Sequence, residues 1–232
     1  MADKPVLTIF AGINGAGKST LYRFQKTTKR SDLGERICPD EILEDNGGDW
    51  TNLADVINSG KIAIRRIDDC IKNKKSFNWE TTLISRMFYQ IVQRAKEQGF
   101  TVNVNFIGVH DVKTSLKRID KRIKKGGHGV PENIVKSRHR AQFDNIAEIL
   151  ELVDNAVFYD NSVVMQVVGT YHKGKLHIFN KAVKWTKIIQ TQYEDYNKEK
   201  LDYMIECRYP KSGTFDNLNN PDSMYNDKDT QK

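Results

Sequence analysis

A glycine-rich octapeptide follows the first apolar run of this chain and leaves few folds open to it. The run reads VLTIFA (residues 6–11) and the octapeptide reads GINGAGKS (residues 12–19). It matches the pattern G-x-x-x-x-G-K-[ST] in full, after a predicted buried strand and before a predicted helix. Glycines let successive backbone N–H groups point inward around an anion, and the helix N-terminus adds partial positive charge. The octapeptide therefore predicts a phosphate-binding loop.

Two side chains of this loop have specific predicted roles. Lys18 can place a mobile positive charge on the β- and γ-phosphates of a nucleotide, and the hydroxyl of Ser19 can bind Mg²⁺. The expected nucleotide-binding residues are Gly12, Asn14, Gly15, Ala16, Gly17, Lys18, Ser19 and Thr20. We therefore expect ATP or GTP as the phosphate donor and Mg²⁺ as the cofactor.

Short apolar runs alternate with segments of helical periodicity along the chain. Strands are predicted at residues 6–11, 36–39, 76–80, 100–109 and 156–159. Helices are predicted between them, with N-caps at Ser85 and Asp111, and one helix runs from Pro131 to about residue 153. A hairpin is predicted over residues 163–179, followed by a helix. This order implies an α/β, P-loop kinase fold: a mostly parallel sheet flanked by helices, with a C-terminal β-hairpin and helix.

The chain has 232 residues, which suits one domain with an elaboration. We expect a single kinase domain over residues 1–205, with a helical basic lid at about residues 111–153. Residues 206–232 are polar with few apolar side chains, and we expect a poorly ordered tail there.

Composition narrows the class of protein. Apolar residues make up 38% and charged residues 29% of the chain, which is typical of a globular protein. No apolar run approaches the roughly 20 residues of a membrane span, and the N-terminus lacks the layout of a signal peptide. The three cysteines, Cys38, Cys70 and Cys207, are widely separated and suit a reducing compartment. We expect a cytoplasmic protein with no membrane partner.

Carboxylates follow two of the predicted strands. Asp40 follows the second strand, where the carboxyl ends of parallel strands open onto a ligand crevice. It is a candidate base for a substrate hydroxyl, and capping the next helix is an equally good interpretation. Glu80 ends the third strand and can bind sugar hydroxyls or water around Mg²⁺, and Thr82 can donate to a phosphate or a hydroxyl. The alternative is a strand-end acid followed by a threonine-rich turn without a role in binding. The strand at residues 102–109 does not end in a conventional Walker B acid, which favours a small kinase over a motor ATPase.

The predicted lid is strongly basic. The formal net charge of +7 allows an anionic partner, and ten lysines and arginines lie between Lys113 and Arg140. Arg118 and Arg122 share one helix face, and cations so placed can stabilise a transferring phosphoryl group. The alternative is a solvated basic face; for Arg122 and Arg138 we favour catalysis. We expect His128, in the sequence GGHG, to order the loop by hydrogen bonding.

These motifs, in this order, resemble the zeta toxin family of P-loop kinases over about residues 6–162. The resemblance depends on the segments GINGAGKST, PDE, NWETTL, GGHGVPE and DNS. It implies ATP- or GTP-dependent phosphorylation of UDP-N-acetylglucosamine at the 3′-hydroxyl of its sugar. It also implies a small helical antitoxin protein as partner.

The resemblance implies roles for individual residues. Lys18 matches the phosphate-binding lysine and Asp40 matches the base, while Glu80 and Thr82 match the sugar-binding acid and threonine. The phosphate-clamping arginines correspond to Arg122 and Arg138, and either Arg118 or Arg140 can hold these roles, because the lid spacing differs from that of plasmid-borne toxins. The region after residue 160 is shorter than in those toxins.

Two other functions remain open on the sequence alone. One is a P-loop kinase for another small-molecule or polynucleotide hydroxyl. The other is a non-enzymatic, nucleotide-gated protein that binds nucleic acid or a partner through the basic lid. Aromatic residues are sparse between Lys113 and Arg140, and we therefore expect no nucleic-acid partner.

Overall fold

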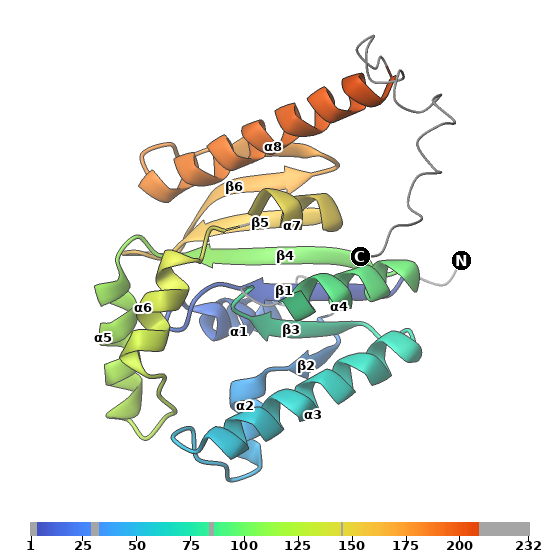
Figure 1. Ribbon diagram of the computed structural model, residues 1–232. Coiled ribbons are helices and arrows are strands. Elements are labelled where there is room, and N and C mark those ends of the chain that lie inside the picture. Colours follow the sequence, from blue (N-terminus) through green and yellow to red (C-terminus); the bar gives the residue numbers. More distant parts are fainter. Residues whose placement is uncertain (1–3, 29–32, 84–85, 145, 209–232) are drawn as a thin grey trace, which may run out of the picture. The chain divides into compact units, whose positions relative to one another are not determined.

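The computed structural model of the chain describes residues 4–28, 33–83, 86–144 and 146–208 (Figure 1). The chain divides into two units, residues 1–193 and 194–232, which are considered separately. In the second unit the described residues, 194–208, are helical. All sites discussed below lie in the first unit.

The first unit is built on one seven-stranded sheet with the order β2-β3-β1-β4-β5-β6-β7. The strands are β1 (Val6–Ala11), β2 (Glu35–Ile37), β3 (Phe77–Thr81), β4 (Thr101–Gly108), β5 (Asn155–Asp160), β6 (Gln166–His172) and β7 (Lys175–Ile178). The first five strands pair in parallel, and β6 and β7 add an antiparallel hairpin at the edge. Strand β1 lies between β3 and β4, so the loop that follows it opens at the middle of the sheet.

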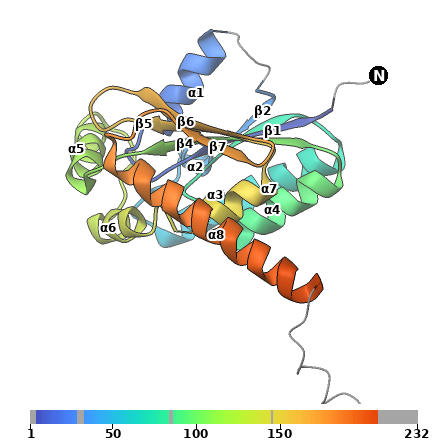
Figure 2. The same ribbon diagram turned by 90° about the horizontal axis from the view of Figure 1, so that it is seen from above.

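Helices cover the sheet unequally. They are α1 (Lys18–Thr27), α2 (Pro39–Asp45), α3 (Leu53–Lys72), α4 (Arg86–Glu97), α5 (Val112–Ile123), α6 (Glu132–Arg140), α7 (Ile146–Leu152) and α8 (Lys184–Arg208). Helix α1 lies on one side of the sheet, and α3, α4 and α7 lie on the other (Figure 2). Helices α5 and α6 lie beyond the carboxyl ends of the parallel strands (Figure 1). The unit therefore has one well-covered face and one thinly covered face.

The well-covered face holds most of the apolar core. On β4, Val102, Val104 and Phe106 are buried, because side chains two apart lie on the same face of a strand. The start of α8 joins this core through Trp185, whose ring lies 6.0 Å from that of Phe106. A Cβ at Gly108 would come within 2.7 Å of the same indole, so β4 and α8 pack too closely for a side chain there.

The α/β fold, the mostly parallel sheet and the C-terminal hairpin and helix are confirmed. One strand boundary differs. Strand β2 ends at Ile37, because Pro39 starts α2 and suits the first turn of a helix. The predicted N-cap at Ser85 and residues 209–232 of the predicted tail lie outside the part described, whereas residues 206–208 continue α8. Among the described residues, no helix has the length and apolar character needed to cross a membrane.

The single helix predicted from Pro131 to about residue 153 is wrong. The structure has two helices there, α6 and α7, with a turn after Arg140. The turn lets Phe143 stack on Trp185, with ring centres 5.4 Å apart, and buries Gln142, whose amide donates to the carbonyl of Val109 at 3.3 Å. Tertiary packing thus overrides a sequence that contains no glycine or proline at the break.

Candidate active site

The octapeptide after β1 forms a tightly enclosed loop. Gly12, Gly15 and Gly17 have φ angles of 141°, 78° and 108°, a region that side chains rarely adopt. A Cβ at Gly17 would clash with the amide of Asn161, and one at Gly15 would lie 2.7 Å from the carbonyl oxygen of Ser115. The loop therefore needs glycine both for its backbone and for its neighbours.

Two side chains from outside the loop fix its shape. The amide of Asn161, just after β5, donates to the carbonyl of Ala16 at 2.7 Å. Arg118 of α5 donates to the carbonyl of Gly15 at 3.3 Å and to that of Asn161 at 2.8 Å. These contacts hold loop carbonyls outward and are consistent with N–H groups that face an anion.

Lys18, Ser19 and Glu80 converge at the start of α1. Lys18 is buried, its Nζ donates to the carbonyl of Ile13 at 3.1 Å, and it lies 3.7 Å from Oε1 of Glu80. The hydroxyl of Ser19 lies 3.2 and 3.0 Å from the two oxygens of Glu80. The acid at the end of β3 thus faces the two loop residues expected to meet phosphate and metal.

Arg36 on β2 was not predicted as a site residue. Its Nη2 lies 2.6 Å from Oε2 of Glu80 and 2.9 Å from Oε1 of Glu41, and its guanidinium stacks 4.0 Å from the ring centre of Tyr22. Burial alone would lower the pKa of Arg36, but the hydrogen bond to Glu41 and the charge of Glu80 raise it above its ordinary value. Arg36 also donates to Asn78, its partner across the β2–β3 pair. It orients Glu80 and balances its charge.

Ser19 and Glu80 form the donor set that best fits Mg²⁺. Mg²⁺ prefers oxygen ligands, and here a hydroxyl and a carboxylate face each other at the end of the loop. A second cluster, Cys38 with Glu41 and Glu80, brings three possible ligand atoms together. Burial and the charge of Glu80 raise the pKa of Cys38 to about 12, so this thiol stays neutral, and Arg36 already neutralises the two acids.

Asp40 lies in the first turn of α2, whose N-cap residue is Cys38, so Asp40 is not the cap. Its Oδ2 lies 2.6 Å from Nε2 of His128, and the other ring nitrogen of His128 lies 3.0 Å from Oε1 of Glu44. His128 therefore orders its loop by hydrogen bonding to α2.

The environment keeps Asp40 ionised. Burial would raise the pKa of Asp40, but the hydrogen bond and the charge of His128 lower it, and Lys18 and Arg122 lower it further. The net direction is below the usual range of an aspartic acid. A carboxylate that is ionised and half-buried can accept a hydroxyl proton during transfer.

The lid arginines differ in what their guanidinium groups contact. Arg122 has buried Nε and Nη2 atoms with no hydrogen-bond partner among the described residues. Such donors demand an acceptor, and an anion would supply one. Arg138 donates to the side chain of Asn14 at 2.5 Å, while Arg118 braces the loop and Arg140 is exposed. Arg122 is therefore the arginine best prepared for phosphate.

These residues surround a cavity of about 250 Å³. Its lining consists of Asn14, Gly15, Gly17, Lys18, Ser19, Thr20, Arg23, Asp40, Glu80, Arg118, Ile119 and Arg122. Most of the predicted site residues thus meet at one crevice. The predicted site residues that are not in this lining are Gly12, Ala16, Thr82 and Arg138; Thr82 is half-buried just after β3.

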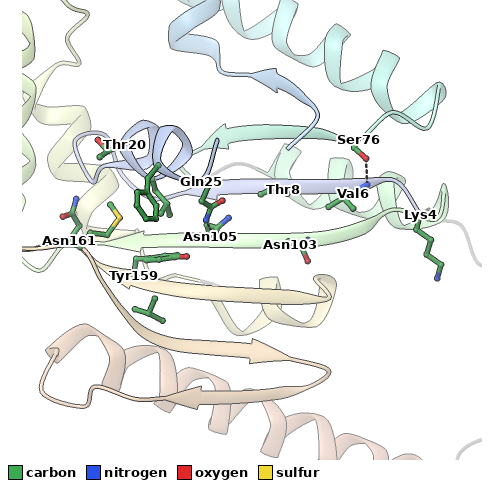
Figure 3. A pocket seen from close by; sticks show the side chains of 14 residues that line it. Lys4, Val6, Thr8, Thr20, Gln25, Ser76, Asn103, Asn105, Tyr159 and Asn161 are labelled. Atoms are coloured by element: carbon green, nitrogen blue, oxygen red, sulfur yellow. Dashed lines mark hydrogen bonds between the residues drawn. The ribbon is translucent and has the colours of Figure 1, made fainter. Parts of the chain in front are cut away.

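A larger groove, of about 1190 Å³, lies over the thinly covered face beside α1. Figure 3 shows its side chains running from Thr20 and Asn161 at one end to Ser76 and Lys4 at the other. Among the described residues, no carboxylate lines it, and Lys4 is the only cation in its lining. We refer to it below as the α1 groove.

The family model of Zeta toxin matches residues 1–184. The chain belongs to the zeta toxin family. Membership in this family of P-loop kinases makes it a kinase-type phosphotransferase. A protein of Haemophilus influenzae, named only as uncharacterized, is 37% identical to this zeta toxin family member over 130 residues, which are 56% of this chain and 89% of that protein.

Two solved structures share the fold. A chain of the AvrRxo1-ORF1:-ORF2 complex superposes with a TM-score of 0.62 at 18% identity, covering 80% of this chain and 64% of that one. The same complex has been solved with ATP. The PezAT chromosomal toxin–antitoxin system of Streptococcus pneumoniae gives a TM-score of 0.56 at 14% identity, covering 88% and 89% of the two chains. This zeta toxin family member thus spans about two thirds of the AvrRxo1 chain and most of the PezAT chain.

Proposed function

We propose that this protein transfers the γ-phosphate of ATP or GTP to the 3′-hydroxyl of the sugar in UDP-N-acetylglucosamine. The observation that carries the proposal is one crevice that joins a phosphate-binding loop, an ionised Asp40 and the unsatisfied donors of Arg122. The donor side is common to P-loop kinases, and the sugar nucleotide follows from the resemblance of the segments around Asp40 and Glu80 to those of the family.

The donor side binds and orients the triphosphate. The loop N–H groups and the positive end of α1 hold the phosphates, and Lys18 moves from its contact with the carbonyl of Ile13 to the β- and γ-phosphates. Ser19, with Glu80 behind it, would hold Mg²⁺, which would supply positive charge to the phosphate oxygens. The contact between Ser19 and Glu80 favours a metal-side role for Glu80 over binding of the sugar.

The acceptor side removes one proton. As the acceptor oxygen bonds to the γ-phosphorus, the bond from that phosphorus to the bridging β–γ oxygen breaks, and the hydroxyl proton moves to Asp40. The guanidinium N–H groups of Arg122 stabilise the charge on the equatorial oxygens. The products are the nucleoside diphosphate and a sugar nucleotide with one more phosphate.

An acceptor assay tests this proposal. The purified chain is mixed with Mg-ATP or Mg-GTP and UDP-N-acetylglucosamine, and the products are weighed by mass spectrometry, with Asp40→Asn as the background. A sugar nucleotide heavier by one phosphate is expected. A parallel panel offers another sugar and a polynucleotide 5′-hydroxyl as acceptors. If one of these is phosphorylated and UDP-N-acetylglucosamine is not, the proposed acceptor is wrong and the kinase activity stands.

We also propose a protein antitoxin partner and a cytoplasmic location. The matched AvrRxo1 and PezAT structures are complexes or systems with a protein partner. The described cysteines Cys38 and Cys70 are free thiols, as a reducing compartment allows. Coexpression with the product of the neighbouring reading frame tests the partner: a stable complex with reduced phosphoryl transfer is expected, and two proteins that elute separately would contradict it.

A further inference from the structure

His128 bridges two carboxylates. Its Nε2 lies 2.6 Å from Oδ2 of Asp40, and its Nδ1 lies 3.0 Å from Oε1 of Glu44. An ionised carboxylate only accepts hydrogen bonds, and a neutral imidazole has one nitrogen that cannot donate. Both contacts are satisfied only if both ring nitrogens carry a proton. The two carboxylate partners therefore require His128 to be an imidazolium, which carries a proton on both ring nitrogens.

The bridge connects two parts of the molecule. Asp40 and Glu44 are four residues apart on α2, and so they share one helix face. His128 belongs to the loop at residues 124–131, which joins α5 to α6. The same loop also lies against the connection between α2 and α3, because a Cβ at Gly129 would come within 2.7 Å of the indole of Trp50. The helix that holds the base is thus tied to the helices that hold the lid arginines.

We propose that His128 is a positioning residue whose imidazolium clamps the 124–131 loop to Asp40 and Glu44. The clamp engages Oδ2 of Asp40 and leaves Oδ1 for the acceptor hydroxyl, and it fixes Arg122 at the end of α5, two residues before the loop. This role deepens the proposed function, on which its catalytic part depends. The contact with Asp40 is the stronger half, because the side chain of Glu44 is 54% exposed and water screens its charge.

The charges around the clamp set its pH range. Burial would lower the pKa of His128, but the hydrogen bond and the charge of Asp40 and the hydrogen bond of Glu44 raise it, while Arg122 from α5 opposes them. On the Asp40 side, His128, Lys18 and Arg122 face the carboxylate, and Arg138 interacts with it from α6. Because the pKa of His128 is raised, the clamp is present at neutral pH and is lost as pH rises through that raised value. Because the pKa of Asp40 is lowered, Asp40 stays ionised in mild acid. The clamp is therefore lost at the acid end only when the pH falls below the usual pKa range of aspartate.

An imidazole NMR titration tests the clamp without any substrate. Nitrogen-labelled histidine reports the protonation of each ring, and the His128 signal is identified by its absence in His128→Asn. We expect the pKa of His128 to lie above about 6.5, with both ring nitrogens protonated at neutral pH. Glu44→Gln should lower this pKa by about half a unit or more, and Asp45→Asn, an exposed charge change on the same helix, should not. A neutral His128 at neutral pH, or equal values in wild type and Glu44→Gln, would overturn the clamp.

A pH–rate profile tests the positioning role. At neutral pH His128→Asn should lower kcat by about 10- to 100-fold with a smaller change in the donor KM, because the base and Arg122 lose their alignment. Glu44→Gln should move the alkaline fall of kcat to lower pH, in parallel with the titration, while Asp45→Asn keeps the wild-type profile. An unmoved alkaline limb would refute the role.

The two arms separate the inference from the proposed function. If no acceptor is phosphorylated, the proposed function fails, and the NMR titration still decides whether the clamp exists. If transfer is observed and the titration shows a neutral His128, the clamp fails and the kinase stands.

Discussion

Two cavities among the described residues differ in opposite ways: one is small and charged, and the other is large and nearly neutral. The crevice at the phosphate loop is the smaller, at about 250 Å³, and is lined by four cations and two carboxylates. The α1 groove, at about 1190 Å³, is lined by neutral side chains apart from Lys4. In the crevice, Nε and Nη2 of Arg122 have no acceptor within the described part of the chain, whereas in the groove Gln25 donates to Asn105 at 3.3 Å. Converging charged side chains with unpaired hydrogen-bond donors therefore indicate the candidate active site better than the volume of the cavity does.

The groove exists because of how the chain continues after β5. The hairpin extends the sheet and Trp185 at the start of α8 packs on the well-covered face, so α1 covers its own face alone among the described helices in Figure 2. A parallel strand covered on both faces is usually apolar throughout. On β1 and β4, however, Thr8, Asn103 and Asn105 face the groove. Their polarity fits a face that meets solvent.

The largest effect is expected at Lys18. Lys18→Met should reduce phosphoryl transfer by on the order of 10³-fold, because the loop then lacks the charge that Lys18 would place on the β- and γ-phosphates. Lys26→Met, on the exposed end of α1, is the matched control and should stay near wild type. Both variants are measured by initial-rate kinetics. Equal losses of rate would mean that the substitutions disturb helix α1, and would contradict a specific contact between Lys18 and the phosphates.

A loss of on the order of 10²-fold is expected at Arg122. Arg122→Gln removes the charge that faces the equatorial oxygens, so kcat should fall more than donor affinity. Its exposed neighbour Lys121 gives the control, Lys121→Gln, with kcat unchanged. If Arg138→Gln instead proved the more damaging change, the phosphate-clamping role would pass to Arg138, which now holds Asn14.

An intermediate effect is expected at Glu80. Glu80→Gln should raise the Mg²⁺ concentration needed for half-maximal rate about tenfold, because the hydroxyl of Ser19 loses its carboxylate partner. Glu41→Gln shares the contact with Arg36 and should change the Mg²⁺ requirement little. A metal titration of the rate distinguishes them, and an unchanged requirement in Glu80→Gln would return Glu80 to the acceptor side.

The smallest effect is expected in the groove. Phe24→Ala and Asn105→Ala should change kcat and both KM values by less than about twofold, since neither side chain reaches the crevice lining. A large loss of phosphoryl transfer in a folded Asn105→Ala protein would show that the α1 groove also contributes to transfer, and would contradict the difference between the groove and the crevice.

The sequence predicted what depends on neighbours along the chain. The loop at residues 12–19 was found because its pattern is local, and Asp111 was found as an N-cap because capping acts over two residues; its side chain accepts from the backbone of Lys113. Asp40 and Glu80 were placed at one crevice because parallel strands end at the same edge of a sheet.

The missed features depend on partners far apart in sequence. Arg36 meets Glu80 across 44 positions, and its role emerges only once β2 lies beside β3. His128 was expected to order its loop, but its partner Asp40 is 88 positions away. Asn161 belongs to the segment DNS, and its hydrogen bond to the phosphate loop spans 145 positions. Hydrophobic periodicity carries no signal for such pairs.

The most direct test of the account is a paired measurement on Asp40→Asn. Nucleotide affinity is measured by calorimetry with Mg²⁺ and a non-hydrolysable ATP analogue, and transfer is measured in a single turnover with UDP-N-acetylglucosamine. The account predicts nucleotide affinity within a few-fold of wild type and transfer reduced by at least about 10²-fold. Transfer at the wild-type rate in the variant would contradict the assignment of Asp40 as the base in this crevice.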